Sequence, residues 1–139
     1  MALFNGNPQP MAMTLRALSH LLGYPDAELR SHLGELRGAL HDERALGAER
    51  LAELDALQAR LAGARAMDTE AAYVEMFDRG RGTSLHLFEH VHGDSRDRGP
   101  AMVDLIKTFE AAGLYLAPGE LPDYLPVVLE FASTQPPPQ

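Results

Sequence analysis

Two runs of leucine at helical spacing constrain the fold of this chain more than any other feature. The first run consists of Leu29, Leu33, Leu36 and Leu40. The second consists of Leu51, Leu54, Leu57 and Leu61. Such spacing gathers each run on one face of an amphipathic helix. Because Gly47 separates the runs, the pattern predicts two helices that pack as an antiparallel hairpin.

Helices are also predicted on either side of this hairpin. The chain has 22 leucines but only six valines and isoleucines together, a bias that favours helix over strand. Apolar spacing, glycines and prolines place six helices at 11–22, 26–40, 48–62, 69–77, 100–112 and 126–131. The segment 85–92 also has helical spacing but is short. The predicted fold class is therefore all-α. We expect one domain over 1–139, with a flexible lead at 1–10 and a proline-rich linker or truncated end at 134–139.

Short polar side chains precede several of these helices and predict N-caps. The candidates are Asp26, Asp68 or Thr69, Asp97 and Asp123. Within the helix at 69–77 the spacing turns Tyr73, Met76 and Phe77 inward, and near the end of the chain Phe131 is expected in the core.

Charge and composition exclude several classes of function. The net charge of −8 repels phosphate backbones, so nucleic acid is not expected as a partner. The absence of cysteine excludes disulfides and thiolate chemistry. No apolar run approaches the ~18 residues that span a bilayer, and no basic, apolar leader opens the chain. We expect a soluble, cytoplasmic protein with no direct membrane insertion.

The sharpest catalytic pattern is H-x-x-E-H, formed by His86, Glu89 and His90. In inverted zincins this pattern places two histidines on one helix face beside a glutamate that acts as base. A zinc hydrolase is therefore the enzymatic alternative, and His92 adds a further imidazole. No third protein ligand is evident, so the residues favour a binding module without a metal. A structural oligomerisation domain is a third hypothesis.

Acidic and aromatic residues occur together near the last helix. Glu120, Asp123 and Glu130 accompany Tyr124 and Phe131. This combination suits a groove for a peptide with apolar and basic side chains.

Three segments carry a family resemblance. Tyr73 to Gly99 reads Y-x-x-M-F-D-R-G-x-x-x-S-L-x-L-F-E-H-V-H-G-x-S-R-D-R-G, and Ala101 to Leu105 and Glu120 to Phe131 follow it. These motifs closely resemble NarJ-type assembly chaperones of respiratory nitrate reductase, in the TorD/DmsD-like superfamily. One departure lies at Pro122 to Pro126, where this chain reads P-D-Y-L-P and relatives commonly read P-D-H-L-P. Tyr124 stands in place of that histidine, so no role of the histidine carries over.

The resemblance implies a TorD/NarJ-like helical bundle without enzymatic turnover and without a cofactor of its own. Such chaperones bind the N-terminal segment of the immature catalytic (alpha) subunit of nitrate reductase and keep it competent for molybdenum cofactor insertion. Family members run on for several further helices. The resemblance therefore implies a fold truncated at its C-terminus, which a homodimer would complete.

The resemblance also suggests binding residues. An amphipathic client helix would lie between Tyr73, Phe77, Tyr124 and Leu125, while nearby acids steer it. The segment from His86 to Arg98 would contact the client's molybdenum cofactor transiently, its arginines meeting pterin phosphates. The full set of expected partner-binding residues is Tyr73, Glu75, Phe77, Asp78, Arg79, Glu89, His90, His92, Arg96, Arg98, Glu120, Asp123, Tyr124, Leu125 and Glu130.

Overall fold

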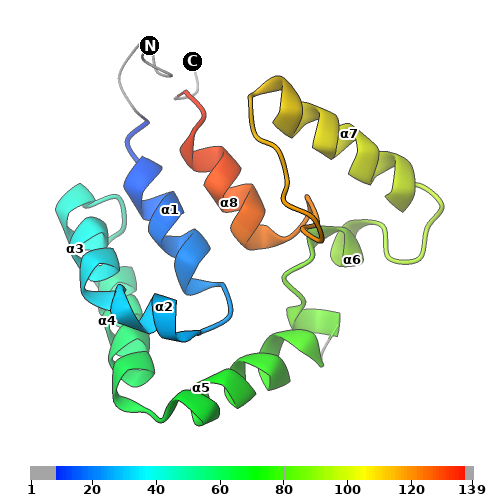
Figure 1. Cartoon of the computed structure of the whole chain (residues 1–139). Helices are drawn as coiled ribbons and strands as arrows, with labels where there is room; N and C mark the ends of the chain where they lie inside the picture. Colours follow the sequence, from blue (N-terminus) through cyan, green and yellow to red (C-terminus); the bar gives the residue numbers. More distant parts are fainter. Residues whose placement is uncertain (1–8, 80, 137–139) are drawn as a thin grey trace.

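The computed structural model describes residues 9–79 and 81–136, and within these ranges it is helical with no strand (Figure 1). Its α-helices are α1 (Ala12–Leu21), α2 (Ala27–Ser31), α3 (Leu33–Glu43), α4 (Ala48–Gly63), α5 (Ala66–Tyr73), α6 (Leu87–Val91), α7 (Arg98–Ala111) and α8 (Leu125–Ser133). A π-helical turn, η1 (Val74–Asp78), extends α5, and a 3-10 turn, η2 (Arg81–Thr83), follows. The predicted all-α class is confirmed. The predicted lead and tail fall largely on 1–8 and 137–139, outside the described residues.

The leucine faces meet in one core. Leu29, Leu33 and Leu40 are buried together with Ala17 and Leu21 of α1. Leucines of the second run pack against this cluster from α4, so α3 and α4 form the predicted hairpin. Burial of these side chains supplies the main driving force for folding this half of the chain.

The first leucine run is not one continuous helix as predicted, because the backbone breaks at His32. The Ser31 hydroxyl and the His32 Nδ1 both bind the Glu28 carbonyl, at 2.7 and 2.8 Å. The His32 N–H, which would reach that carbonyl in an α-helix, bonds to Leu29 O at 3.0 Å instead. Side-chain competition of this kind divides α2 from α3.

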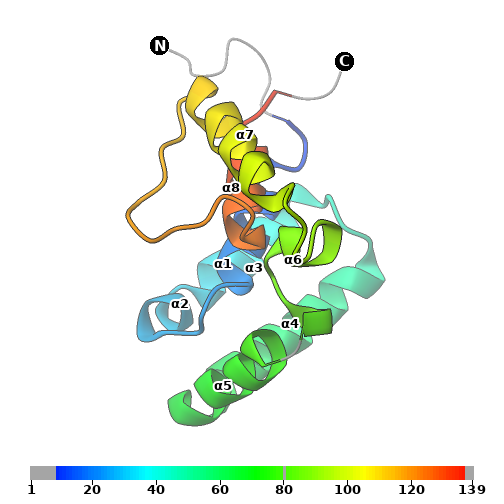
Figure 2. The same ribbon diagram turned by 90° about the vertical axis from the view of Figure 1, so that its right-hand side faces the viewer.

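The first and last helices pack side by side. α1 and α8 are in extensive contact, and Figure 2 shows the same pair from the side. The Ser19 hydroxyl of α1 donates to the Pro126 carbonyl of α8 at 2.6 Å. This contact brings the segment around 120–130 next to the C-terminal end of α1.

Helix α7 is joined to α8 by aromatic packing. Phe109 is fully buried, and its ring centroid lies 4.5 Å from that of Phe131. After α7, Leu114 N–H bonds to Phe109 O and Gly113 N–H to Glu110 O, with Gly113 at φ +90°. This pattern is a Schellman motif, which glycine accommodates without strain. The core role of Phe131 and the helix end at Gly113 are confirmed.

Of the predicted N-caps Asp26 is confirmed, because its carboxylate accepts the Leu29 N–H at 2.8 Å, whereas the caps predicted for the helices at 69–77, 100–112 and 126–131 are wrong. Helix α5 begins at Ala66, so Asp68 and Thr69 lie inside it. Asp97 precedes α7 but its side chain makes no cap, and its own N–H bonds to the Ser95 hydroxyl at 3.1 Å.

The prediction that Met76 faces inward is also wrong, since its residue surface is 56% exposed. Tyr73 and Phe77 are partly buried as expected. The π-turn at Val74–Asp78 has more residues per turn than an α-helix and rotates the register from that point on. Among the described residues, no helix is long and apolar enough to cross a membrane.

The N-terminus of α1 is capped from a distant position in the sequence. The Glu43 carboxylate, at the end of α3, accepts the N–H groups of Met13 and Thr14 at 2.9 and 2.7 Å. These are donors that the first turn of a helix cannot satisfy internally. Burial raises the pKa of Glu43, but the hydrogen bonds from Thr14 and Met13 outweigh burial and lower the pKa below its usual value.

We expect Glu43→Gln to lower the free energy of unfolding by about 1 kcal/mol at pH 7, the usual contribution of a helix cap. Because the folded pKa is lowered, the stabilisation is present above the unfolded pKa of 4.5 and is lost as pH falls through the folded value. Urea unfolding at pH 7 and pH 3, with exposed Glu49→Gln as control, measures both effects. Equal stability of Glu43→Gln and wild type at pH 7 would contradict this role.

Candidate functional site

A groove of about 500 Å³ opens where α1, η1, the 119–121 loop and the start of α8 meet. We call it the tyrosine groove, because Tyr24, Tyr73 and Tyr124 line it. Three acids, Asp78, Glu120 and Glu130, also line it, whereas no described lysine or arginine does. The groove therefore combines aromatic surface with negative charge.

The groove brings together five of the predicted binding residues. These are Tyr73, Asp78, Glu120, Tyr124 and Glu130. Sequence reasoning missed the contributions of Ser19, Tyr24, Leu121 and the α8 residues Pro126 and Val127. Tyr24 and Ser19 lie far from the recognised motifs in sequence, and only the packing of α1 against α8 places them here.

A junction formed by the hydroxyl groups of Tyr73 and Tyr124 and the Leu22 carbonyl connects three segments at the groove. The Tyr73 hydroxyl donates to the Leu22 carbonyl at 2.8 Å and lies 2.8 Å from the Tyr124 hydroxyl, which donates to it. The Tyr24 and Phe77 rings flank Tyr73 at centroid distances of 5.6 and 4.8 Å. Burial, and then the Tyr124 hydrogen bond, raise the pKa of Tyr73 far above its usual value, so the phenol stays neutral.

Asp123 was predicted to cap the last helix and to bind the partner, and the structure gives its carboxylate another contact. The residue is fully buried, α8 has no side-chain cap, and Oδ2 accepts the N–H of Phe88 at 3.1 Å. Phe88 is the second residue of α6, so Asp123 caps α6 from across the fold. The backbones also pair: Leu87 N–H bonds to Asp123 O and Leu125 N–H to Leu85 O, at 2.9 and 2.8 Å.

The arrangement that a zinc hydrolase requires is not formed. His86 precedes α6 with an extended backbone, at φ −88° and ψ 107°, so it does not share a helix face with His90. The His90 ring instead bonds to the Ser84 carbonyl at 2.8 Å, and Glu89 pairs with Arg98 at 2.9 Å. Across the described residues, no group of three or more potential ligands could hold a metal ion. The prediction of one shared histidine face is wrong.

Several predicted binding residues lie outside the groove. Glu75 and Arg79 form an exposed pair at 3.4 Å on η1. Arg98 is held by Glu89 and by the Gly93 carbonyl, while Arg96 is exposed. The His92 ring packs edge-on against Phe88 at 5.0 Å. Leu125 is partly buried beside the groove and contributes its N–H to the backbone pairing.

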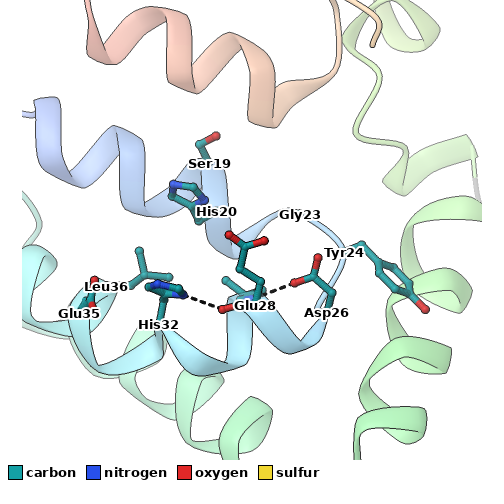
Figure 3. Close-up of a pocket in the computed structure, with 10 residues that line it drawn as sticks. Ser19, His20, Gly23, Tyr24, Asp26, Glu28, His32, Glu35 and Leu36 are labelled. Atoms are coloured by element: carbon teal, nitrogen blue, oxygen red, sulfur yellow. Dashed lines mark hydrogen bonds between the residues drawn. The ribbon is translucent and has the colours of Figure 1, made fainter. Parts of the chain in front are cut away.

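A second cavity of about 580 Å³ lies on the other side of Tyr24 and Ser19, against α2 and α3. Figure 3 shows Asp26, Glu28 and Glu35 around it, with the His32 ring directed at the Glu28 carbonyl. The hydrogen bond to that carbonyl, followed by the charge of Glu35, raises the pKa of His32 above its usual value. Ser19 and Tyr24 line both cavities, so the second cavity adjoins the tyrosine groove, and His20 and His32 accompany the three acids in its lining.

Comparison with known families and proteins identifies relatives of this chain. Residues 25–136 match the family model described as nitrate reductase delta subunit. The chain is 48% identical over 119 residues to the nitrate reductase molybdenum cofactor assembly chaperone NarJ of Escherichia coli K12, covering 86% of this chain and 50% of that protein. It is 33% identical over 130 residues to a probable NarJ chaperone of Bacillus subtilis, covering 91% of this chain and 68% of that one.

A solved structure supports the fold. The crystal structure of a putative redox enzyme maturation protein from Archaeoglobus fulgidus superposes with a TM-score of 0.63 at 20% identity, over 94% of this chain and 72% of that one. At this level of identity the likeness concerns the fold alone. The chain spans about half the length of the Escherichia coli relative.

Tyr73→Phe tests the hydroxyl junction. Removing one oxygen leaves the Leu22 carbonyl without its partner, and we expect the free energy of unfolding to fall by about 1 kcal/mol. Tyr115, whose surface is 71% exposed, provides the matched control, since Tyr115→Phe should change stability by only a few tenths. Urea denaturation of the two variants measures the difference. Equal stability of both variants would show that the junction contributes nothing.

Proposed function

This chain belongs to the nitrate reductase delta subunit family, and on that premise we propose that it is an assembly chaperone of nitrate reductase. In this proposal it binds the N-terminal segment of the immature catalytic (alpha) subunit in the cytoplasm. It keeps that subunit competent for molybdenum cofactor insertion and carries out no enzymatic turnover. The names of its relatives describe molybdenum cofactor assembly chaperones, which supports this assignment.

The observation that carries the proposal is the composition of the tyrosine groove. Tyrosine rings offer apolar faces together with polar edges, which suits an amphipathic peptide. Asp78, Glu120 and Glu130 attract basic side chains, while the absence of described lysines and arginines from the lining avoids repulsion. Phe77 packs against the groove residue Tyr73, with ring centroids 4.8 Å apart.

The proposal also includes a contact between the client's molybdenum cofactor and Arg96. Arg98 is occupied by Glu89, whereas Arg96 is exposed on the turn before α7. An exposed guanidinium suits a phosphate oxygen. Unchanged cofactor content of the client after co-expression with Arg96→Ala would exclude this contact.

Neutralising groove acids tests the main proposal. Asp78→Asn with Glu130→Gln should reduce the association rate of a fluorescent client N-terminal peptide by about tenfold at low salt, because charges at a groove rim steer encounter. The same peptide should bind the two proteins at similar rates at high salt, where screening removes the steering. Stopped-flow fluorescence at two salt concentrations measures both quantities.

The matched control is Asp42→Asn with Glu49→Gln, which removes two exposed acids from α3 and α4. If both double variants slow association equally, net charge rather than the groove attracts the peptide. If no client peptide binds the folded wild type while a concentration-dependent dimer forms, the oligomerisation hypothesis replaces the chaperone.

A further inference from the structure

We propose that His86 is the residue of the tyrosine groove that accepts a hydrogen bond from a basic side chain of the bound segment, and that Asp123 positions it by holding the ring proton on Nδ1. This inference rests on the proposed function. The hydrogen bond to His86 would be a short-range contact that selects the client segment. Asp78, Glu120 and Glu130, in contrast, attract a basic segment at longer range.

The first observation is a pair of buried atoms that lack hydrogen-bond partners. Among the described residues, the Nδ1 of His86 and the Oδ1 of Asp123 are both buried without one, and they lie 3.6 Å apart. The other oxygen of Asp123 is already used by the Phe88 N–H. An ionised carboxylate can only accept hydrogen bonds, so the contact is attractive only when Nδ1 carries a proton.

The second observation concerns the orientation of the ring. The His86 ring lies 5.0 Å from the Tyr124 ring at an interplanar angle of 31°, and the two residues face each other in an antiparallel bridge. The His86 side chain is 38% exposed and lines the groove although Nδ1 is buried. The exposed edge of the ring is therefore the edge that carries Nε2.

These two observations determine what the ring offers to a ligand. A neutral imidazole has one N–H and one acceptor nitrogen, and the group that faces one nitrogen sets the state of the other. Oδ1 of Asp123 lies 3.6 Å from Nδ1, beyond hydrogen-bond distance, and its acceptor character favours the proton on the nitrogen that faces it. With its proton held on Nδ1, His86 presents the lone pair of Nε2 to the groove. The lining contains acids but no described lysine or arginine that would donate to this lone pair.

The matching ligand group carries N–H donors and a positive charge. Arginine and lysine meet both conditions, because Asp78, Glu120 and Glu130 supply the counter-charge around the lone pair. A guanidinium group can in addition stack on the tyrosine rings. The group recognised at this position is thus a basic side chain, and the apolar residues of the segment occupy the aromatic part of the groove.

Nitrogen-15 NMR of the imidazole rings tests the position of the proton. We expect the proton of the His86 ring on Nδ1, whereas His41, whose Nε2 lies 2.9 Å from Asp55 Oδ1, should carry its proton on Nε2. In Asp123→Asn the amide oxygen retains the Phe88 N–H, so the NH₂ group turns towards Nδ1 and the proton moves to Nε2. Asp123→Asn should therefore weaken client peptide binding by about tenfold, the loss of one hydrogen bond to a charged group.

The matched control for Asp123→Asn is Asp55→Asn, which makes the same change in a histidine–aspartate pair outside the groove and should leave peptide affinity unchanged. Should Asp123→Asn fail to fold, His86→Gln and His86→Asn replace it. Glutamine carries an oxygen close to the position of Nε2 and should bind within roughly threefold of wild type, whereas asparagine reaches only the position of Nδ1 and should bind about tenfold more weakly.

The outcomes separate this inference from the proposed function. If the wild type binds the client peptide but His86 is protonated on Nε2 or on both nitrogens, or if His86→Asn binds like wild type, the role of His86 is overturned and the chaperone assignment stands. If the folded wild type does not bind the peptide at all, the proposed function fails, and the ligand assigned to His86 fails with it.

Discussion

The buried carboxylate of Asp123 is the interaction on which the candidate site depends. It stands fully enclosed between the start of α6 and the loop that leads into α8, and it satisfies an N–H of α6 that the helix itself cannot pair. The adjacent backbone pairing holds His86 beside Tyr124. Burying a carboxyl group costs free energy unless its oxygens have partners; Oδ2 accepts the Phe88 N–H, while Oδ1 faces Nδ1 of His86 at 3.6 Å. Two segments 35 residues apart are thereby held in fixed register at one wall of the tyrosine groove.

A second part of the tyrosine groove depends on Tyr73. Its hydroxyl group links the end of α1 to Tyr124, and its ring lies between Tyr24 and Phe77. The π-turn that follows Tyr73 turns Met76 outward and leaves Asp78 at the groove. Such turns occur often at functional sites, where they redirect side chains that a regular helix would place elsewhere. The groove thus combines the tyrosine junction with Asp78 on the π-turn, Glu120 on a loop and Glu130 on α8.

Much of the helical framework could be predicted from the sequence, because leucine spacing and glycine stops are local signals. The hairpin of α3 and α4, the end of α7 at Gly113 and the packing of Phe131 illustrate this. The two long-range helix caps could not be predicted. Glu43 and Asp123 cap helices that lie about 30 residues away in sequence, and no local pattern records those contacts. The local H-x-x-E-H pattern offers His86 only as a candidate ligand for the zinc alternative, whereas its extended backbone places it in the groove.

Site-specific alkylation tests the central claim, that the client segment occupies the tyrosine groove, most directly. The chain has no cysteine, so a single Leu121→Cys at the groove or Val103→Cys on α7 supplies one thiol at sites of similar exposure, 45% and 50%. A client N-terminal peptide that carries a bromoacetyl group should alkylate Leu121→Cys rapidly, and unlabelled peptide should suppress the reaction. Equal alkylation of the two thiols, or faster reaction at Val103→Cys, would contradict the account.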